Sequence, residues 1–125
     1  SQKAALAALQ GNRQDVKEGI KRFNINRTNM IKELDKLDYI LNYIKPNGAY
    51  YILAKLKTPK PINSFKLALK ILNETGVIVI PGDAFGPSGK NHIRFSFAGR
   101  PENIQLGFKR LTVWFQDWQK NNYKL

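Results

Sequence analysis

The sequence contains no cysteine and only one histidine, His92. The lack of cysteine excludes disulfide bonds, thiolate zinc sites and a cysteine nucleophile, and it fits a cytoplasmic protein. With a single histidine, histidine-rich metal sites and histidine proton relays are excluded as well. We therefore expect this chain to bind no metal and to contribute no catalytic residue of its own.

Long apolar runs are also missing. None approaches the roughly 20 residues that a membrane helix needs, so we expect no membrane span. The sequence begins with Ser1 and Gln2 and shows no leader pattern. This beginning favours an excised domain or a processed product over a complete gene product. A chain of 125 residues fits one compact domain with a real core.

Acidic residues are scarce, with 9 Asp and Glu against 21 Lys and Arg, for a net charge of +12. A basic balance of this kind is compatible with nucleic-acid binding. The lysines are scattered, however, and no block of five or six like charges occurs. The aromatic residues lie mostly on apolar stripes rather than beside clustered cations. A free-standing basic nucleic-acid-binding module remains the alternative, and nucleic acid is not the partner we expect.

The first 40 residues are predicted to be helical. Residues 1–9 are rich in alanine, and from Asp15 apolar residues recur at three- and four-residue steps for about 25 residues. Such a helix, about 37 Å long, is longer than a domain of this size is wide. We therefore expect part of it to lie against something outside this chain. The pattern of Leu37–Ile44 fits either a short strand or continued helix.

Residues 41–125 read as an α+β body. The predicted elements are strand 49–56, helix 64–75, strand 77–80, strand 91–98 and a final helix from Pro101 to about Asn121. Asn63 and Gly76 are typical caps for the middle helix. Its buried stripe is predicted to be Leu67, Ile71 and Leu72, and the all-apolar run Val77–Ile80 is expected to be covered on both faces. The element order predicts two layers, with helices on one face of a small, mainly antiparallel sheet.

Arg94 lies within a strand that alternates cleanly. Ile93 and Phe95 point toward the expected core, so Arg94 should point away from the helices, near the Gly- and Pro-rich loop 81–89. From the residues alone, an ion pair with a surface acid is the ordinary explanation for such an arginine.

Five segments, in this order and at these spacings, carry a family resemblance. They are QKAALAAL at 2–9, KPNGAYY at 45–51, LNETGV at 72–77, PGDAFG at 81–86 and HIRFSFA at 92–98. Each motif is weak alone, but the ordered set covers nearly the whole chain. It resembles the C-terminal small domain of a pyridoxal-phosphate-dependent aminotransferase of the aspartate aminotransferase type (fold type I, class I/II).

The resemblance assigns roles to a few residues. The arginine that matches Arg94 binds the α-carboxylate of the amino-acid substrate, and a planar guanidinium suits that task because it can form two parallel hydrogen bonds. The loop that carries Gly82 and Phe85 is implied to line the site. Asp83 departs from the small residue usual at its position, and either altered substrate preference or a side chain in solvent would follow. His92 has no implied catalytic role.

The resemblance also implies what lies outside this chain. The lysine that forms a Schiff base with pyridoxal phosphate, and the rest of the cofactor site, are expected upstream, in the protein's own N-terminal large domain. The chain alone should be inert and bind no cofactor. At full length it is expected to be a cytoplasmic homodimer that transfers an amino group from an amino acid to a 2-oxo acid. A lyase or decarboxylase of the same fold is the second alternative.

Overall fold

The computed structural model describes all 125 residues of the chain. Its helices and strands are, in order, α1 (Gln2–Gln10), α2 (Gln14–Asp35), β1 (Leu41–Tyr43), β2 (Tyr51–Leu56), α3 (Ser64–Thr75), β3 (Ile80–Pro81), β4 (His92–Ser96) and α4 (Pro101–Lys120). The four strands form one sheet in the order β1-β2-β4-β3, and every neighbouring pair is antiparallel.

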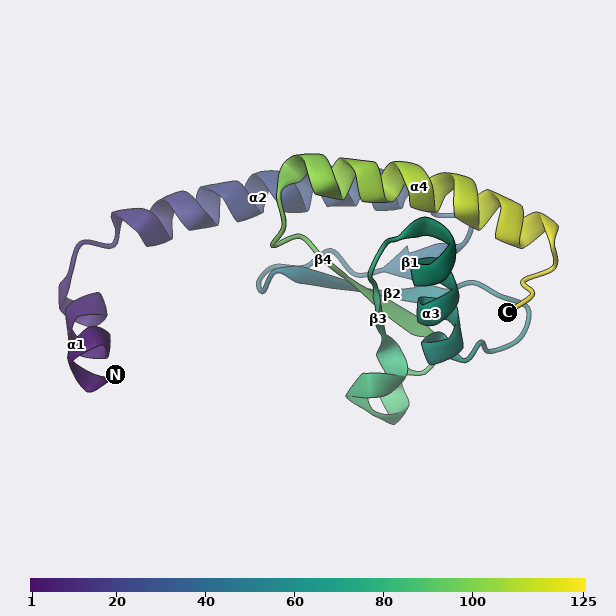
Figure 1. Cartoon of the computed structure of the whole chain (residues 1–125), viewed down its shortest axis with the longest axis horizontal. Helices are drawn as coiled ribbons and strands as arrows, with labels where there is room; N and C mark the ends of the chain where they lie inside the picture. The colour runs from purple at the N-terminus through teal and green to yellow at the C-terminus, as the bar shows by residue number, and fades with distance from the viewer.

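The sheet has one covered face and one open face. Along β2, burial alternates residue by residue from the exposed Tyr51 to the buried Leu56. Along β4, Ile93 and Phe95 are buried while their neighbours are not. Figure 1 shows α2 and α4 running side by side over the sheet, with α3 packed next to them. The predicted two-layer α+β fold is therefore confirmed.

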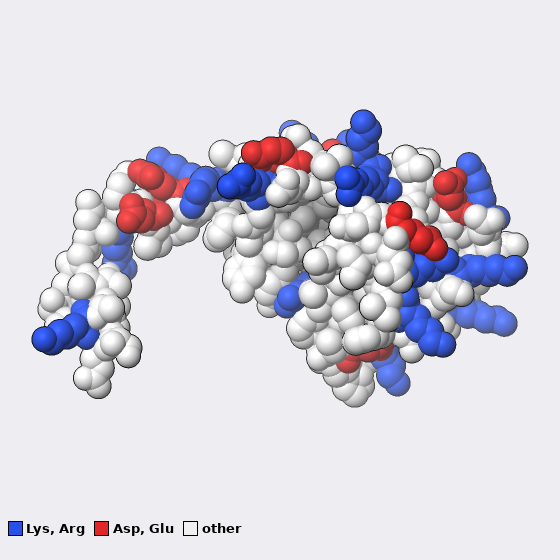
Figure 2. Space-filling view, viewed as in Figure 1, with Lys and Arg blue, Asp and Glu red and all other residues white.

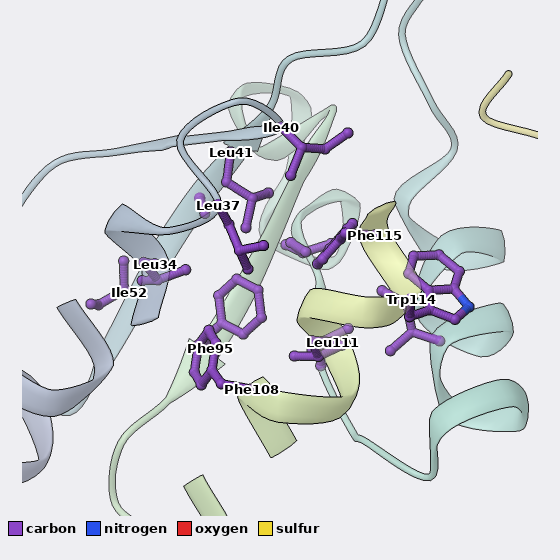
Figure 3. Packing of buried hydrophobic residues seen from close by; sticks show 14 of the residues in the cluster. Leu34, Leu37, Ile40, Leu41, Ile52, Phe95, Phe108, Leu111, Trp114 and Phe115 are labelled. Carbon is purple, nitrogen blue, oxygen red and sulfur yellow. The ribbon is translucent and has the colours of Figure 1, made fainter. Parts of the chain in front are cut away.

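The centre of the core joins β4 to α4. The rings of Phe95 and Phe108 lie 5.5 Å apart between centroids, and Leu111 packs beside them (Figure 3). Burial of one such side chain contributes about 1.5–3 kcal/mol, so these contacts hold β4 firmly under α4. The buried residues of α4 are Ile104, Phe108, Leu111, Trp114, Phe115 and Trp118.

The caps of α3 are those that the sequence predicts. The side chain of Asn63 accepts a hydrogen bond from the Lys66 N–H at 2.9 Å, and Gly76 closes the helix with a φ of 70°. The predicted stripe is right for Leu67 and Ile71 and wrong for Leu72, which is 37% exposed. Ala68 takes the buried place instead, because it lies on the same helical face as the other two.

The apolar run Val77–Ile80 is not a strand covered on both faces. Only Ile80 belongs to β3, and Ile78 is 75% exposed. Val79 is buried, so the run presents alternate residues to the core. The physical reason is its position, because β3 lies at the edge of a sheet whose second face is open.

The N-terminal arm, defined here as residues 2–25, extends away from the body (Figure 1). Its larger apolar residues are all exposed and are Leu6, Leu9, Val16, Ile20, Phe23 and Ile25. Burial within α2 begins at Asn26 and continues at Met30 and Leu34. The prediction of a long helix is confirmed, and only its second half packs on this chain's core.

The segment Leu37–Ile44 forms a turn followed by a short strand. The helical alternative is wrong beyond Asp35, and Leu41–Tyr43 forms β1 at the sheet edge. The hydroxyl of Tyr43 donates to Asp35 Oδ1 at 2.5 Å. Burial, together with the hydrogen bond and the charge of Asp35, raises the pKa of Tyr43 well above its usual value.

Candidate functional site

Arg94 occupies the middle of the open sheet face. In the strand register it lies opposite Leu53 of β2 on one side and Ile80 of β3 on the other. Its neighbours in sequence, Ile93 and Phe95, are buried under the helices. The predicted direction of the side chain, away from the helical layer and beside loop 81–89, is therefore confirmed.

Two aromatic rings flank the Arg94 guanidinium. Its Cζ atom lies 4.8 Å from the ring centroid of Phe85 and 4.9 Å from that of Tyr51. A cation within about 6 Å of a ring centroid is attracted by the negative face of the ring. The loop and β2 thus each supply one ring that restricts the guanidinium, and both rings remain partly exposed.

The guanidinium has no acidic partner within the chain. The ion pairs of the structure join Lys36 to Glu33, Lys70 to Glu74 and Lys120 to Asp117. The Nε atom of Arg94 is buried without a hydrogen-bond partner. Arg94 as a whole is only partly buried, and a guanidinium without an acidic partner is suited to an external anion. The surface ion pair that the residues alone favoured is not formed.

Loop 81–89 folds into two short 3₁₀ turns, Gly82–Phe85 and Pro87–Gly89. Gly82 and Gly89 lie against each other, and a Cβ added at Gly82 would be 2.2 Å from the Gly89 carbonyl oxygen. The buried Gly82 is therefore required by the packing of the loop itself. Whether Gly82 also lines a ligand site stays a prediction, whereas the half-exposed Phe85 lies directly over Arg94.

Asp83 points neither into solvent nor to Arg94. Its Oδ2 atom accepts hydrogen bonds from the Ser64 N–H at 3.0 Å and from the Ser64 hydroxyl at 2.5 Å. The Asp83 N–H donates back to the Ser64 hydroxyl at 3.1 Å. Of the two alternatives left open for Asp83, the side chain in solvent is not observed, because the first turn of α3 offers free donors next to the loop.

His92 begins the same face, two residues before Arg94. Its Nδ1 atom lies 2.7 Å from the Lys90 carbonyl oxygen, so the ring is held toward the end of the loop. With Tyr51 and Lys55 it borders an open groove of about 440 Å³ that is lined by β1, β2 and the segment connecting them. Nothing in this arrangement gives His92 a part in proton transfer, and the expectation that it has no catalytic role stays a prediction.

Three residues that the sequence analysis did not assign support this face. Tyr51 could have been found from strand pairing, since it shares a face with Arg94 on the neighbouring strand. Asn91 has a φ of 61°, and its side chain bonds the Ile62 N–H and the Leu56 carbonyl, which fixes the end of the loop. Asn26 donates to the carbonyls of Phe97 and Gly99 at 2.9 and 2.8 Å, beyond the end of β4.

The lysines do not form a cofactor-attachment site. All of them are exposed except Lys70, which is half-buried and pairs with Glu74 at 2.7 Å. A Schiff-base lysine is normally desolvated or activated by a neighbouring cationic group. Figure 2 shows the basic side chains spread along α2 and over the end of the body near α3, with acidic side chains among them. No group of His, Asp or Glu could hold a metal, and no helix is both long and apolar enough to cross a membrane.

Comparison with protein families gives a match over most of the chain. The family model described as aminotransferase class I and II matches residues 1–111. The glutamate-pyruvate aminotransferase AlaC of Escherichia coli is 30% identical over 116 residues, which cover 92% of this chain. A probable aspartate aminotransferase of Methanocaldococcus jannaschii is 34% identical over 108 residues, or 84% of this chain.

Solved structures agree with the sequence matches. The alanine aminotransferase of Pyrococcus furiosus superposes with a TM-score of 0.84 and 27% identity, over 91% of this chain and 29% of that protein. The aromatic aminotransferase of Pyrococcus horikoshii gives a TM-score of 0.82 and 30% identity, over 93% of this chain and 31% of that protein. This chain spans 28% and 26% of the two sequence relatives.

Proposed function

The chain belongs to the class I and II aminotransferases, and we propose that it is the C-terminal small domain of an enzyme that transfers an amino group between an amino acid and a 2-oxo acid. Within that enzyme, its own contribution is to bind the substrate α-carboxylate through Arg94, beneath a wall that includes Phe85. The small share of its relatives' length that it spans supports the view that the remaining chemistry lies elsewhere.

The observation that carries this proposal is the unpaired guanidinium between two rings. Arg94 has no acid to neutralise it, an Nε without a partner, and aromatic rings on two sides. A carboxylate can accept two parallel N–H bonds from such a fork, which fixes its position and orientation together. Correct orientation aligns the substrate's Cα–H bond for proton removal, and alignment of this kind lowers the barrier of a bound reaction.

The cofactor we propose for the full-length protein is pyridoxal 5′-phosphate, held by the large domain rather than by this chain. The exposed lysines described above do not fit cofactor attachment. When bound, the cofactor supplies the electron sink on which amino-group transfer depends. The residues of this chain bind and orient the substrate and close one side of the site against water.

We propose that the exposed apolar side of the N-terminal arm packs on that large domain. Leu9 of α1 and Ile20 and Phe23 of α2 are exposed apolar residues that this chain's own core leaves uncovered. A homodimer and a cytoplasmic location complete the proposal for the full-length protein. A lyase or decarboxylase of the same fold would use the same carboxylate contact, and product analysis with the amino donor separates it from an aminotransferase.

The test is substitution of Arg94 in the full-length enzyme. The donor is the one with the highest kcat/KM in a panel of the twenty L-amino acids, with pyruvate and 2-oxoglutarate as acceptors. Arg94→Ala should raise the donor KM by about 10- to 100-fold, because charge-assisted hydrogen bonds are lost. Cofactor absorbance should stay unchanged, and Arg94→Lys should fall between, since it keeps the charge without the fork.

Arg110→Ala is the matched control, because it removes the same group from an exposed position on α4, where its hydrogen bond goes to the Thr75 carbonyl at the end of α3. Its donor KM should equal that of the wild type. An Arg94→Ala enzyme with wild-type kinetics would show that the carboxylate is bound elsewhere.

A further inference from the structure

We propose that Asp83 is a positioning residue whose carboxylate, by clasping Ser64 at the start of α3, fixes the loop turn that holds Phe85 over Arg94. This inference rests on the proposed role of Arg94 in carboxylate binding and adds a residue that acts on it from a distance. Three hydrogen bonds between only two residues form the clasp, and they join the loop to a helix 19 positions earlier in sequence.

The helix end explains why an acid is suited to this task. The first N–H groups of a helix have no partner within it, and the helix dipole places partial positive charge there. Asn63 caps the N–H of Lys66, which leaves the Ser64 N–H for Asp83. Ser64 is fully buried, so its hydroxyl depends on this partner for both of its hydrogen bonds.

The hydrogen bonds between Asp83 and Ser64 affect Arg94 through one tight turn of the loop. Asp83 and Phe85 belong to the same 3₁₀ turn, Gly82–Phe85, and its first residue is wedged against Gly89. With its start held by glycine packing and its second residue held to α3, the turn leaves Phe85 little freedom. The ring is thereby kept 4.8 Å from the guanidinium carbon of Arg94.

The arrangement also directs the negative charge of Asp83 toward the helix and away from the substrate position. An acid that faced a bound carboxylate would weaken its binding, so removing it would lower KM. An acid that positions the loop has the opposite effect, because its removal loosens Phe85 and raises KM. The sign of the change therefore separates the two roles.

The experiment uses the full-length enzyme with Asp83→Ala, Asp83→Asn, Ser64→Ala and the Asp83→Ala/Ser64→Ala double variant. Asp83→Ala should raise the donor KM about threefold to tenfold, as expected for one lost cap-type contact, with kcat and cofactor absorbance retained. Asp83→Asn should restore part of the loss, because its amide oxygen can still accept the Ser64 N–H bond. The double variant should match Asp83→Ala alone, since both residues act through one contact.

Hydrogen–deuterium exchange of residues 82–91 gives a readout that is independent of activity. Exchange in this segment should rise in Asp83→Ala and Ser64→Ala and stay at the wild-type level in Asp117→Ala, an exposed acid of α4. A lowered or unchanged donor KM in Asp83→Ala, or multiplied effects in the double variant, would overturn the proposal. A lower kcat with an unchanged donor KM in Asp83→Ala would overturn it as well, because the residue would then have a purely structural role. If Arg94→Ala also leaves KM unchanged, the proposed function fails, and the exchange data still report on the clasp.

Discussion

Replacement of Phe85 tests whether the aromatic rings preorganise Arg94. An arginine side chain that is free before binding must be ordered when the carboxylate arrives, at a cost of about 0.5–1.5 kcal/mol. The contact between the guanidinium and the half-exposed Phe85 ring is worth about 0.5–1 kcal/mol. This is enough to offset most of the ordering cost by keeping the Arg94 side chain in place before the carboxylate binds. At 1.4 kcal/mol per factor of ten, loss of this contact in Phe85→Ala should raise the donor KM of the full-length enzyme about twofold to fivefold.

A second substitution separates the aromatic face from simple apolar cover. Phe85→Leu keeps much of the volume and lacks the ring, so its KM should lie close to that of Phe85→Ala. Tyr51→Leu removes the other ring, at 4.9 Å, and should have an effect of similar size. Steady-state kinetics with the donor chosen above give the values, and kcat should change little. Wild-type KM in Phe85→Leu beside a raised KM in Phe85→Ala would refute the reasoning, because apolar cover alone would then suffice.

Two further substitutions test the structural statements. Gly82→Ala should lower the free energy of unfolding in urea by about 1–3 kcal/mol through overpacking, because its Cβ would meet the Gly89 carbonyl oxygen at 2.2 Å. Gly48→Ala is the control, since a Cβ there has nothing within 4 Å, and its free energy of unfolding should stay within about 0.5 kcal/mol of the wild type. Equal losses in the two variants would contradict the packing argument. For Tyr43, whose folded-state pKa is raised, the contribution to stability is full below about pH 10 and is lost as pH rises toward the folded pKa. Unfolding measured across pH 9–11 should therefore decline less steeply in Tyr43→Phe, and parallel curves would show that Asp35 does not hold the phenol.

The sequence predicted correctly those helix ends and strand faces that depend only on residues within the same segment. The ends of α3 at Asn63 and Gly76 could be predicted, because the chemistry of a helix cap depends on one residue and its immediate neighbours. The direction of Arg94 followed from a strict alternation of apolar residues, which leaves a strand only one way to face a core.

The errors arise where a neighbour distant in sequence decides the outcome. An apolar run such as Val77–Ile80 looks alike at a sheet centre and at an edge, and only the strand order places it at the edge. Asp83 was expected to face solvent or substrate because nothing in its own segment reveals that the start of α3 lies beside it. Tyr51 needed the register of β2 with β4 before its ring could be placed near Arg94.

The bonds of Asn26 have a mechanical consequence. They anchor the middle of α2 to the backbone just after β4, while the half of the helix before them stands free of the body (Figure 1). Asn26 therefore ties the free half of α2 to the backbone that directly follows the strand of Arg94, so the direction in which the arm leaves the body is fixed at Phe97 and Gly99.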